Sequence, residues 1–251
     1  MSDKTALGDR MKRYEAVTRL VLPRRTYTII RVDGRAFHSV LRKAAKPFDG
    51  YVAHAMVNTA EDLCKDIQGA RFAYTQSDEI SILVTDFEST HTEAWFGGVL
   101  QKMVSISAAM ATSSFGEYYN TSETALFDSR VFTIPDPSEV ANYFLWRQRD
   151  AVKNSISMAA QANFPHKSLQ NLNGDQLQEK LFQEKGINWS TDYPDWAKRG
   201  WLVKKETYEV YPRVIDTFDM PVPSAVRTQW VTDAAPRLDW QGWMDLIPQY
   251  S

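Results

Sequence analysis

Cysteine is nearly absent from this chain of 251 residues, because Cys64 is the only one. One cysteine forms no intramolecular disulfide and no cysteine-rich zinc module. Histidine is also sparse, with 4 in the chain and no His-Glu-x-x-His pair, which argues against a histidine zinc site. No run reaches the roughly 20 apolar residues that span a bilayer, and the N-terminus lacks a leader-like apolar segment. The sequence therefore predicts a cytoplasmic protein with no membrane partner.

The chain also lacks a strong net charge. Its 29 Lys and Arg face 31 Asp and Glu, which leaves −2 at pH 7. This balance argues against a wholly basic nucleic-acid coat, although a local basic face remains open. With 11 Gly and 11 Pro, collagen-like and low-complexity chains are excluded. The length suffices for a real core, since chains near this size bury roughly 70–75% of their unfolded surface.

Hydrophobic periodicity predicts the element order β-α-β-β-α-β with a further helix after it. The expected strands cover residues 26–32, 72–75, 80–84 and 131–134. The expected helices cover residues 48–67, 92–115 and, with Ser138 as N-cap, 138–163. This is the split βαβ, ferredoxin-like pattern. We predict an α+β fold whose sheet carries helices on one face and leaves the other open.

The two ends of the chain are expected to add to this unit. A charged and apolar alternation over residues 4–20 predicts a short N-terminal helix. Periodicity weakens beyond Pro165, so we expect a main domain over residues 1–165 and a C-terminal extension over 166–251. Within the extension we expect a helix at 175–185 and a basic, aromatic hairpin at 196–211.

Carboxylates lie at two strand ends that this topology brings together. Asp33 and Gly34 follow the first strand, and Asp78 and Glu79 lie in the turn between the second and third. Mg²⁺ prefers oxygen ligands and takes one or two carboxylates plus substrate phosphates. The pattern therefore indicates a magnesium site, and the plainer alternative is a turn beside a polar hairpin.

Basic side chains near this edge are candidates for binding phosphates: Arg35, His38, Lys46 and Lys102. Lys46 precedes Pro47 in a rigid loop, which suits a fixed positive charge. Lys102 lies within a helix, where a solvated role is the common alternative.

A second set of polar and basic residues interleaves with aromatic ones. It comprises Arg147, Asp150, Lys153 and Asn154 on one helix, and Lys198, Arg199, Lys204 and Lys205 near Trp196 and Trp201. Cations with aromatic side chains suit RNA, through phosphate pairing and base stacking. The alternatives are a salt-bridged helix face and a basic hairpin with buried aromatics.

Several segments together resemble the tRNA-histidine guanylyltransferase superfamily. They are RVDGRAFHSV (31–40), KPFD (46–49), YTQSDEISILV (74–84), FDSRVFTIP (127–135), WRQRDAVKNS (146–155), LFQEKGINW (181–189) and AKRGWLV (197–203). The resemblance implies a polymerase palm-type catalytic domain that adds nucleotides to RNA 5′ ends in the 3′–5′ direction. It also implies a homotetramer.

The resemblance assigns roles by position. Asp33, the Gly34 carbonyl and Asp78 resemble the ligands of two Mg²⁺ ions, and Glu79 matches a further acidic catalytic position. The implied nucleotide-binding residues are Asp33, Gly34, Arg35, Ala36, Phe37, His38, Lys46, Asp49, Ser77, Asp78 and Lys102. Arg147, Asp150 and Asn154 match a helix that handles RNA.

Two departures point to one branch of the superfamily. Val152 stands where eukaryotic members have a histidine, and Ser155 replaces an asparagine. Both resemble the guanylyltransferase-like branch, which is implied to extend 5′-truncated tRNAs by Watson–Crick templating. ATP or GTP would activate the 5′ phosphate, and GTP or another nucleoside triphosphate would be added. The alternatives are single-G addition to histidine tRNA, a nucleotide cyclase on the same palm-like fold, and non-catalytic RNA binding.

Overall fold

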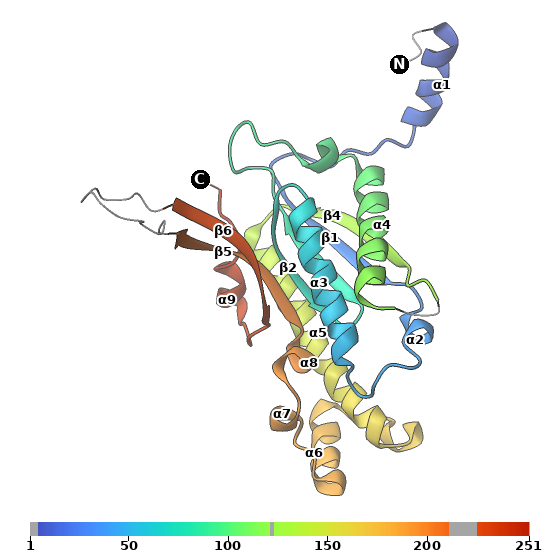
Figure 1. The fold of residues 1–251 in the computed structure, drawn as a ribbon, viewed down its shortest axis with the longest axis vertical. Coiled ribbons are helices and arrows are strands. Elements are labelled where there is room, and N and C mark those ends of the chain that lie inside the picture. Colours follow the sequence, from blue (N-terminus) through green and yellow to red (C-terminus); the bar gives the residue numbers. More distant parts are fainter. Residues whose placement is uncertain (1–4, 121–122, 211–224, 251) are drawn as a thin grey trace, which may run out of the picture.

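Within the described part of the chain, six antiparallel strands form one sheet in the order β4-β1-β3-β2-β5-β6 (Figure 1). The structure is a computed structural model and describes residues 5–120, 123–210 and 225–250. The strands are β1 (Tyr27–Gly34), β2 (Ala70–Gln76), β3 (Glu79–Val84), β4 (Phe127–Ile134), β5 (Trp201–Val210) and β6 (Ala225–Ala234).

The helices of the described residues vary from one turn to more than seven. The α-helices are α1 (Ala6–Ala16), α2 (Phe37–Val40), α3 (Gly50–Asp66), α4 (Leu100–Tyr118), α5 (Pro137–Asn163), α6 (Gly174–Lys185), α7 (Trp189–Asp192), α8 (Asp195–Arg199) and α9 (Trp240–Met244). Two 3₁₀ turns are η1 (Trp95–Gly98) and η2 (His166–Leu169).

The predicted βαββαβ core is present, with α3 and α4 together on one face of the sheet (Figure 1). Ile30 and Ile82 point to this face and are fully buried against the apolar stripe of α3, which includes Met56 and Leu63. Cys64 belongs to the same stripe, and burial raises the pKa of its thiol. The interpretation of Cys64 as a small core residue is therefore confirmed.

The opposite face of the sheet is covered too, which corrects the expected open face. Helices α5 and α9 pack there, with Phe144 and Trp243 against Phe72 and Leu83 (Figure 1). The reason lies in the central strand, because every residue of β3 is buried. A strand with apolar side chains on both faces needs cover on both faces.

Two helix starts differ from the prediction. Helix α4 begins at Leu100 and not near residue 92, because Gly97 and Gly98 adopt left-handed backbone angles within η1 (φ 61° and 73°). Asp136, not Ser138, is the N-cap of α5, and its carboxylate accepts the Ser138 N–H at 2.7 Å. Pro137 then occupies the first helical position, where its missing N–H has no partner to lose.

The sheet continues across the expected boundary at residue 165, because β5 pairs with β2. Gly200 makes this approach possible at φ 77°, since a Cβ there would lie 2.2 Å from the Thr75 carbonyl oxygen. The expected hairpin over 196–211 is different in detail: residues 195–199 form α8, and β5 pairs with β6. Tyr211 lies outside the described residues.

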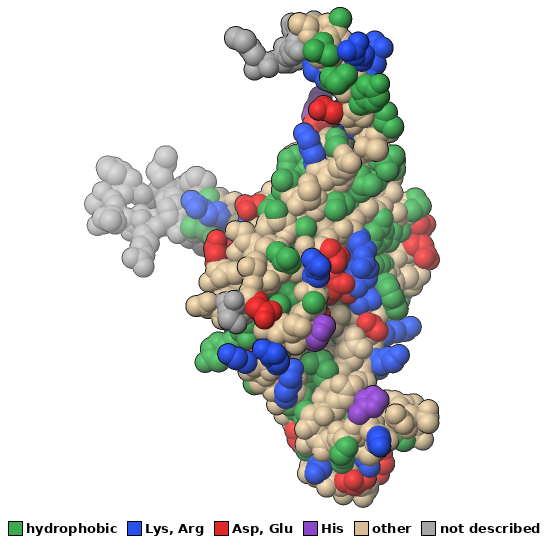
Figure 2. Space-filling model, turned by 90° about the vertical axis from the view of Figure 1, so that its right-hand side faces the viewer, with side chains coloured by type: hydrophobic (Ala, Val, Ile, Leu, Met, Phe, Trp, Pro, Cys, Tyr) green, Lys and Arg blue, Asp and Glu red, His purple; other side chains and the backbone are tan. Residues whose placement is uncertain are grey.

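Helix α1 stands away from the rest of the molecule (Figure 1) and has no buried residue. No helix among the described residues is long and apolar enough to cross a bilayer. Figure 2 shows the face at the right of Figure 1, where acidic and basic side chains lie side by side at mid-height without forming one continuous basic area.

Candidate active site

The ends of β1 and of the β2–β3 hairpin meet, as the sequence predicts. Asp33 is paired with Glu79 across the β1–β3 ladder, so their side chains share one face of the sheet. The Gly34 N–H donates to the Asp78 carbonyl at 2.9 Å. A left-handed backbone at Ser77 (φ 52°) closes the two-residue turn that carries Asp78. We call Asp33, Gly34 and Asp78 the carboxylate edge.

Gly34 has a packing role at this edge. A Cβ on Gly34 would lie 2.3 Å from Cδ2 of Phe37. Phe37 is 3% exposed and its ring is held between Phe115 and Phe127, so it has no room to move aside. A side chain at position 34 would therefore displace the core beneath the carboxylate edge.

The carboxylate edge suits a divalent cation by its charge. Burial raises the pKa of Asp78, and the nearby Asp33 carboxylate raises it further. A carboxylate whose proton affinity is raised by burial and by a second carboxylate binds a cation that takes the place of the proton. No group of three or more His, Cys, Asp or Glu that could hold a metal occurs among the described residues. The donor set of two carboxylates and a backbone carbonyl matches Mg²⁺, which completes its shell with water and phosphate.

Glu79 lies in a different environment from its neighbour Asp78. The Arg147 guanidinium donates to both oxygens of Glu79, at 2.7 and 2.9 Å, and Arg31 also pairs with this carboxylate. Arg147 reaches Asp150 at 3.2 Å as well. We call Glu79, Arg31, Arg147 and Asp150 the ion-pair cluster. Burial raises the pKa of Glu79, and the two guanidinium groups oppose that rise.

Both oxygens of Glu79 are thus engaged, and Arg147 is only 4% exposed. This geometry links β3 to α5 and positions the hairpin that carries Asp78. It differs from the two expectations for these residues, which were a catalytic Glu79 and an Arg147 that contacts RNA.

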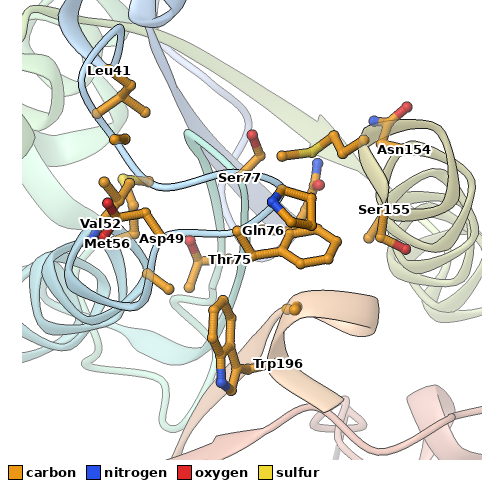
Figure 3. Close-up of a pocket in the computed structure, with 18 of the residues that line it drawn as sticks. Leu41, Asp49, Val52, Met56, Thr75, Gln76, Ser77, Asn154, Ser155 and Trp196 are labelled. Carbon is orange, nitrogen blue, oxygen red and sulfur yellow. Dashed lines mark hydrogen bonds between the residues drawn. The ribbon is translucent and has the colours of Figure 1, made fainter. Parts of the chain in front are cut away.

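A pocket opens beside Ser77, between α3 and α5 (Figure 3). Three predicted residues, Lys46, Asp49 and Ser77, line it together with Asn154. Trp196 from α8 closes it from the side opposite Ser77 (Figure 3). We call this hollow the α3–α5 pocket. Because Asp78 follows Ser77 directly, the pocket adjoins the carboxylate edge.

Asp49 holds the loop in front of this pocket. Its carboxylate accepts the N–H groups of Tyr51 at 2.8 Å and Ala45 at 2.8 Å, so one side chain caps α3 and fixes the preceding loop. Lys46 lies on that loop and lines the pocket. The loop is therefore a rigid support for a positive charge.

The tRNAHis guanylyltransferase family model matches residues 8–135, just over half of the chain. The chain belongs to this family. It is accordingly a nucleotidyltransferase.

Relatives of this guanylyltransferase-family chain extend the match. An uncharacterised protein of Acanthamoeba polyphaga mimivirus is 30% identical over 227 residues, which are 80% of this chain and 77% of the viral protein. A bacterial tRNA(His) guanylyltransferase-like protein in complex with ATP is 46% identical, with a TM-score of 0.78 over 91% of this chain and 92% of that one. One in complex with GTP is 44% identical, with a TM-score of 0.78 over 93% of each chain. These neighbours agree with the palm-type fold that the resemblance implies.

The remaining predicted nucleotide-binding residues differ in their exposure to solvent. Phe37 is buried in the core, whereas Arg35, Ala36 and His38 are exposed after β1. Lys102 is exposed on the first turn of α4 and does not line the α3–α5 pocket. The structure therefore brings Lys46, Asp49 and Ser77 together in the α3–α5 pocket, and Lys102 is not among the residues that line it.

The predicted RNA-contacting residues differ in exposure and in their partners. Like Arg147, Lys198 is buried (6% exposed); it donates to the Ser190 carbonyl at 2.6 Å. Lys204 pairs with Glu206, and Lys205 lies over the Trp230 ring. Lys153 and Asn154 are exposed on α5, and Asn154 donates to Asp150 at 3.2 Å. Arg199 binds the Ala235 carbonyl at 3.1 Å.

Asp128 and Arg130 lie beside Asp33 and are absent from the site residues that the sequence predicts. Asp128 is paired with Asp33 across the β1–β4 ladder, and Arg130 lies 3.9 Å from the Asp33 carboxylate. Strand β4 begins at Phe127, four residues before the predicted start. The signal that could have found them was the period of two in Asp128-Ser129-Arg130, which places both charged side chains on the Asp33 face.

Proposed function

We propose that this chain is a templated 3′–5′ nucleotidyltransferase that restores missing nucleotides at the 5′ end of tRNA. The observation that carries the proposal is the junction of two features. Asp33 and Asp78 form an open carboxylate edge, and Ser77 joins that edge to the α3–α5 pocket. A phosphate chain that extends from the pocket would reach the carboxylates directly.

Asp33, Asp78 and the Gly34 carbonyl would hold two Mg²⁺ ions. When bound, such a pair lowers the pKa of the attacking hydroxyl and neutralises charge on the leaving phosphate. The half-buried position of Asp78 favours this role, because its ionised form is poorly solvated without a cation.

The proposed reaction has two transfers. An oxygen of the RNA 5′-monophosphate attacks the α-phosphorus of ATP or GTP, and pyrophosphate leaves. The 3′-hydroxyl of the next nucleoside triphosphate then attacks the activated 5′ phosphorus, loses its proton, and expels AMP or GMP. The RNA gains one nucleotide and carries a new 5′-triphosphate.

Residues of the α3–α5 pocket would bind and orient the nucleotide. Lys46 offers a point charge for the triphosphate, and Asp49 keeps that loop in place. Asn154 and Trp196 offer an amide and an aromatic ring for the base (Figure 3). The bacterial relatives solved in complex with ATP and with GTP support a nucleoside triphosphate as the ligand.

Addition of a single G to histidine tRNA is the second candidate, because the matching family is described by that activity. Val152 favours the templated reaction, since it stands where the resemblance places a histidine in enzymes that add one G.

The test is an extension assay on a 5′-monophosphorylated tRNA that lacks its first nucleotide. ATP and one nucleoside triphosphate at a time are supplied, and the template base opposite the gap is varied. Incorporation that follows the template base supports the proposal. Addition of G regardless of that base supports the second candidate, and a cyclic nucleotide formed without RNA would indicate a cyclase.

We further propose that the active form is a homotetramer. Helix α1 supports assembly, because Leu7, Met11 and Tyr14 are 56%, 43% and 71% exposed on a helix with no buried residue. Light scattering after gel filtration tests this state. A monomeric mass at micromolar concentration would contradict it.

A further inference from the structure

A groove lies between α5, α7 and the segment that leads into α9. Its volume is about 730 Å³. Its lining includes Arg149, Trp189, Arg199 and Arg237. We call it the arginine groove. It shares α5 and α8 with the α3–α5 pocket, but the two hollows are lined by different residues of these helices.

Two of these arginines have no intramolecular partner among the residues that the structure describes. Arg149 and Arg237 are exposed, and neither forms an ion pair or a side-chain hydrogen bond within the described part of the chain. Arg199 is held at the groove by its bond to the Ala235 carbonyl. An exposed guanidinium without a carboxylate partner retains all of its donors for an external anion.

The backbone around Arg237 is fixed from α5. Gln148 is 4% exposed, donates to the Pro236 carbonyl at 2.9 Å and accepts the Leu238 N–H at 3.0 Å. These two bonds flank Arg237 and hold its backbone beside Arg149, the next residue of α5. A buried glutamine that ties down both neighbours of an exposed arginine preorganises that arginine for binding.

The acidic residues near the groove are already engaged. Asp239 caps α9 by accepting the Gly242 N–H at 2.9 Å. Asp195 pairs with Lys198 at 3.1 Å and with Arg199. Arg149 and Arg237 therefore give the groove an excess of positive charge. Trp189 adds an aromatic ring to the lining, and stacking on such a ring suits nucleic-acid bases.

We propose that the arginine groove binds the RNA substrate through its phosphate backbone, with Arg149 and Arg237 as the principal contacts. The groove includes Arg199 from the predicted RNA surface and adds two exposed guanidinium groups that have no partner among the described residues. The inference rests on the proposed function for the identity of the polyanion, and it adds the place where that substrate is gripped.

The test compares RNA binding by the wild type with that of Arg149→Gln/Arg237→Gln. The probe is a fluorescently labelled, unmodified tRNA transcript, followed by anisotropy without nucleotide at several salt concentrations. Each lost phosphate contact lowers the slope of log K against log salt by about 0.7–0.9. We therefore expect the slope of the double variant to fall by about 1.5 and its Kd at 0.1 M salt to rise about tenfold or more.

The matched control is Arg10→Gln/Arg13→Gln on α1, which removes the same charge far from the groove (Figure 1). Its Kd should change less than about twofold, because a 0.1 M salt solution screens charges beyond about 10 Å. A second variant, Gln148→Leu, leaves the charge unchanged and should raise Kd by loosening the backbone around Arg237. Thermal melting of all variants shows that they are folded.

A wild-type Kd and salt slope in the folded Arg149→Gln/Arg237→Gln variant would overturn the inference, as would an equal loss in the α1 control. These results are distinct from a failure of the proposed function. If the wild type binds RNA through the groove but transfers no nucleotide, the proposed function is wrong and the proposed RNA-binding role of the groove is supported. If the wild type extends tRNA and the Arg149→Gln/Arg237→Gln variant does so with an unchanged KM for RNA, the proposed RNA-binding role of the groove is wrong and the proposed function is supported.

Discussion

Asp78 and Glu79 are consecutive acidic residues with opposite surroundings. Asp78 lies in the hairpin turn at the open carboxylate edge, and its side chain makes no ion pair within the described residues. Glu79 is the first residue of β3, and the ion-pair cluster encloses it. A one-residue step from turn to strand therefore separates a carboxylate that can take an external cation from one that two guanidinium groups already neutralise.

The difference separates the residues proposed to take part in catalysis from the residues that hold the fold in place. At the carboxylate edge Asp33 has only the distant pairs with Arg31 at 3.8 Å and Arg130 at 3.9 Å, so negative charge remains that a metal ion would neutralise. The ion-pair cluster has its charges matched internally and joins β3 to α5. Because breaking a buried pair leaves an uncompensated charge, the cluster resists displacement of the hairpin on which Asp78 is carried.

The largest expected effect comes from Asp78→Asn. Loss of this proposed metal ligand should remove several kcal/mol of transition-state stabilisation, which is about a thousandfold or more in the rate of nucleotide transfer. The measurement is single-turnover extension of a 5′-truncated tRNA. Asp128→Asn is the matched control, since Asp128 is exposed at the edge of the same site, and its rate should fall less than about tenfold. A normal rate in Asp78→Asn would show that the carboxylate edge is not the catalytic centre.

Arg147→Met should produce the next largest effect, on stability. It leaves the buried Glu79 with one guanidinium partner and should cost about 3–5 kcal/mol of unfolding free energy in urea. Lys65→Met breaks an exposed pair with Glu61 and should cost less than about 1 kcal/mol. Equal losses in the two variants would mean that the ion-pair cluster contributes no more than a surface pair.

Lys46→Gln should weaken nucleotide binding. A hydrogen bond to a charged group contributes about 1.5–3 kcal/mol, so KM for the nucleoside triphosphate should rise about tenfold or more. Lys43→Gln, on the same loop but outside the pocket lining, is the control and should leave KM unchanged. An equal rise in both variants would indicate a general effect of charge near the pocket.

The smallest expected effect is on the pH dependence of stability without metal. Because the folded-state pKa of Asp78 is raised, its favourable contribution is present below the ordinary carboxyl pKa and is lost as pH rises through the raised value. Ionised Asp78 therefore destabilises the metal-free protein at neutral pH. Asp78→Asn should be the more stable protein at pH 7 in EDTA, with the gap closing toward pH 4, as measured by urea unfolding. An Asp78→Asn variant that is less stable than the wild type at pH 7 in EDTA would contradict this prediction.

Much of the fold follows from periodicity, and each exception has a physical cause. The period of 3.6 residues in α3 is strong because one side of that helix is wholly buried. The start of α4 was misplaced because the apolar Trp95 and Val99 continue its pattern into η1, where Gly97 and Gly98 break the helix. Periodicity did not predict that helices cover the second face of the sheet. The pairing of β5 with β2 and the packing of α9 on α5 are contacts between distant parts of the sequence.

The candidate site was predictable to a similar degree. Asp33 and Asp78 lie at strand ends, so topology alone brings them together. The partner of Glu79 was not predictable, because Arg147 lies 68 residues away and reaches Glu79 only through packing of α5 on the sheet. The arginine groove combines residues from α5, α7, α8 and the segment before α9, and no local pattern in the sequence indicates that they meet.

The most direct test of the different roles of Asp78 and Glu79 is thermal unfolding of the wild type, Asp78→Asn and Glu79→Gln. Each protein is measured with ATP, once in Mg²⁺ and once in EDTA. A ligand that binds only the folded state raises its stability with concentration. The account predicts a Mg²⁺-dependent rise for the wild type, no rise for Asp78→Asn, and a rise for Glu79→Gln from a lower starting temperature. A rise retained by Asp78→Asn and lost by Glu79→Gln would contradict it, because Glu79 would then be the carboxylate that holds the metal.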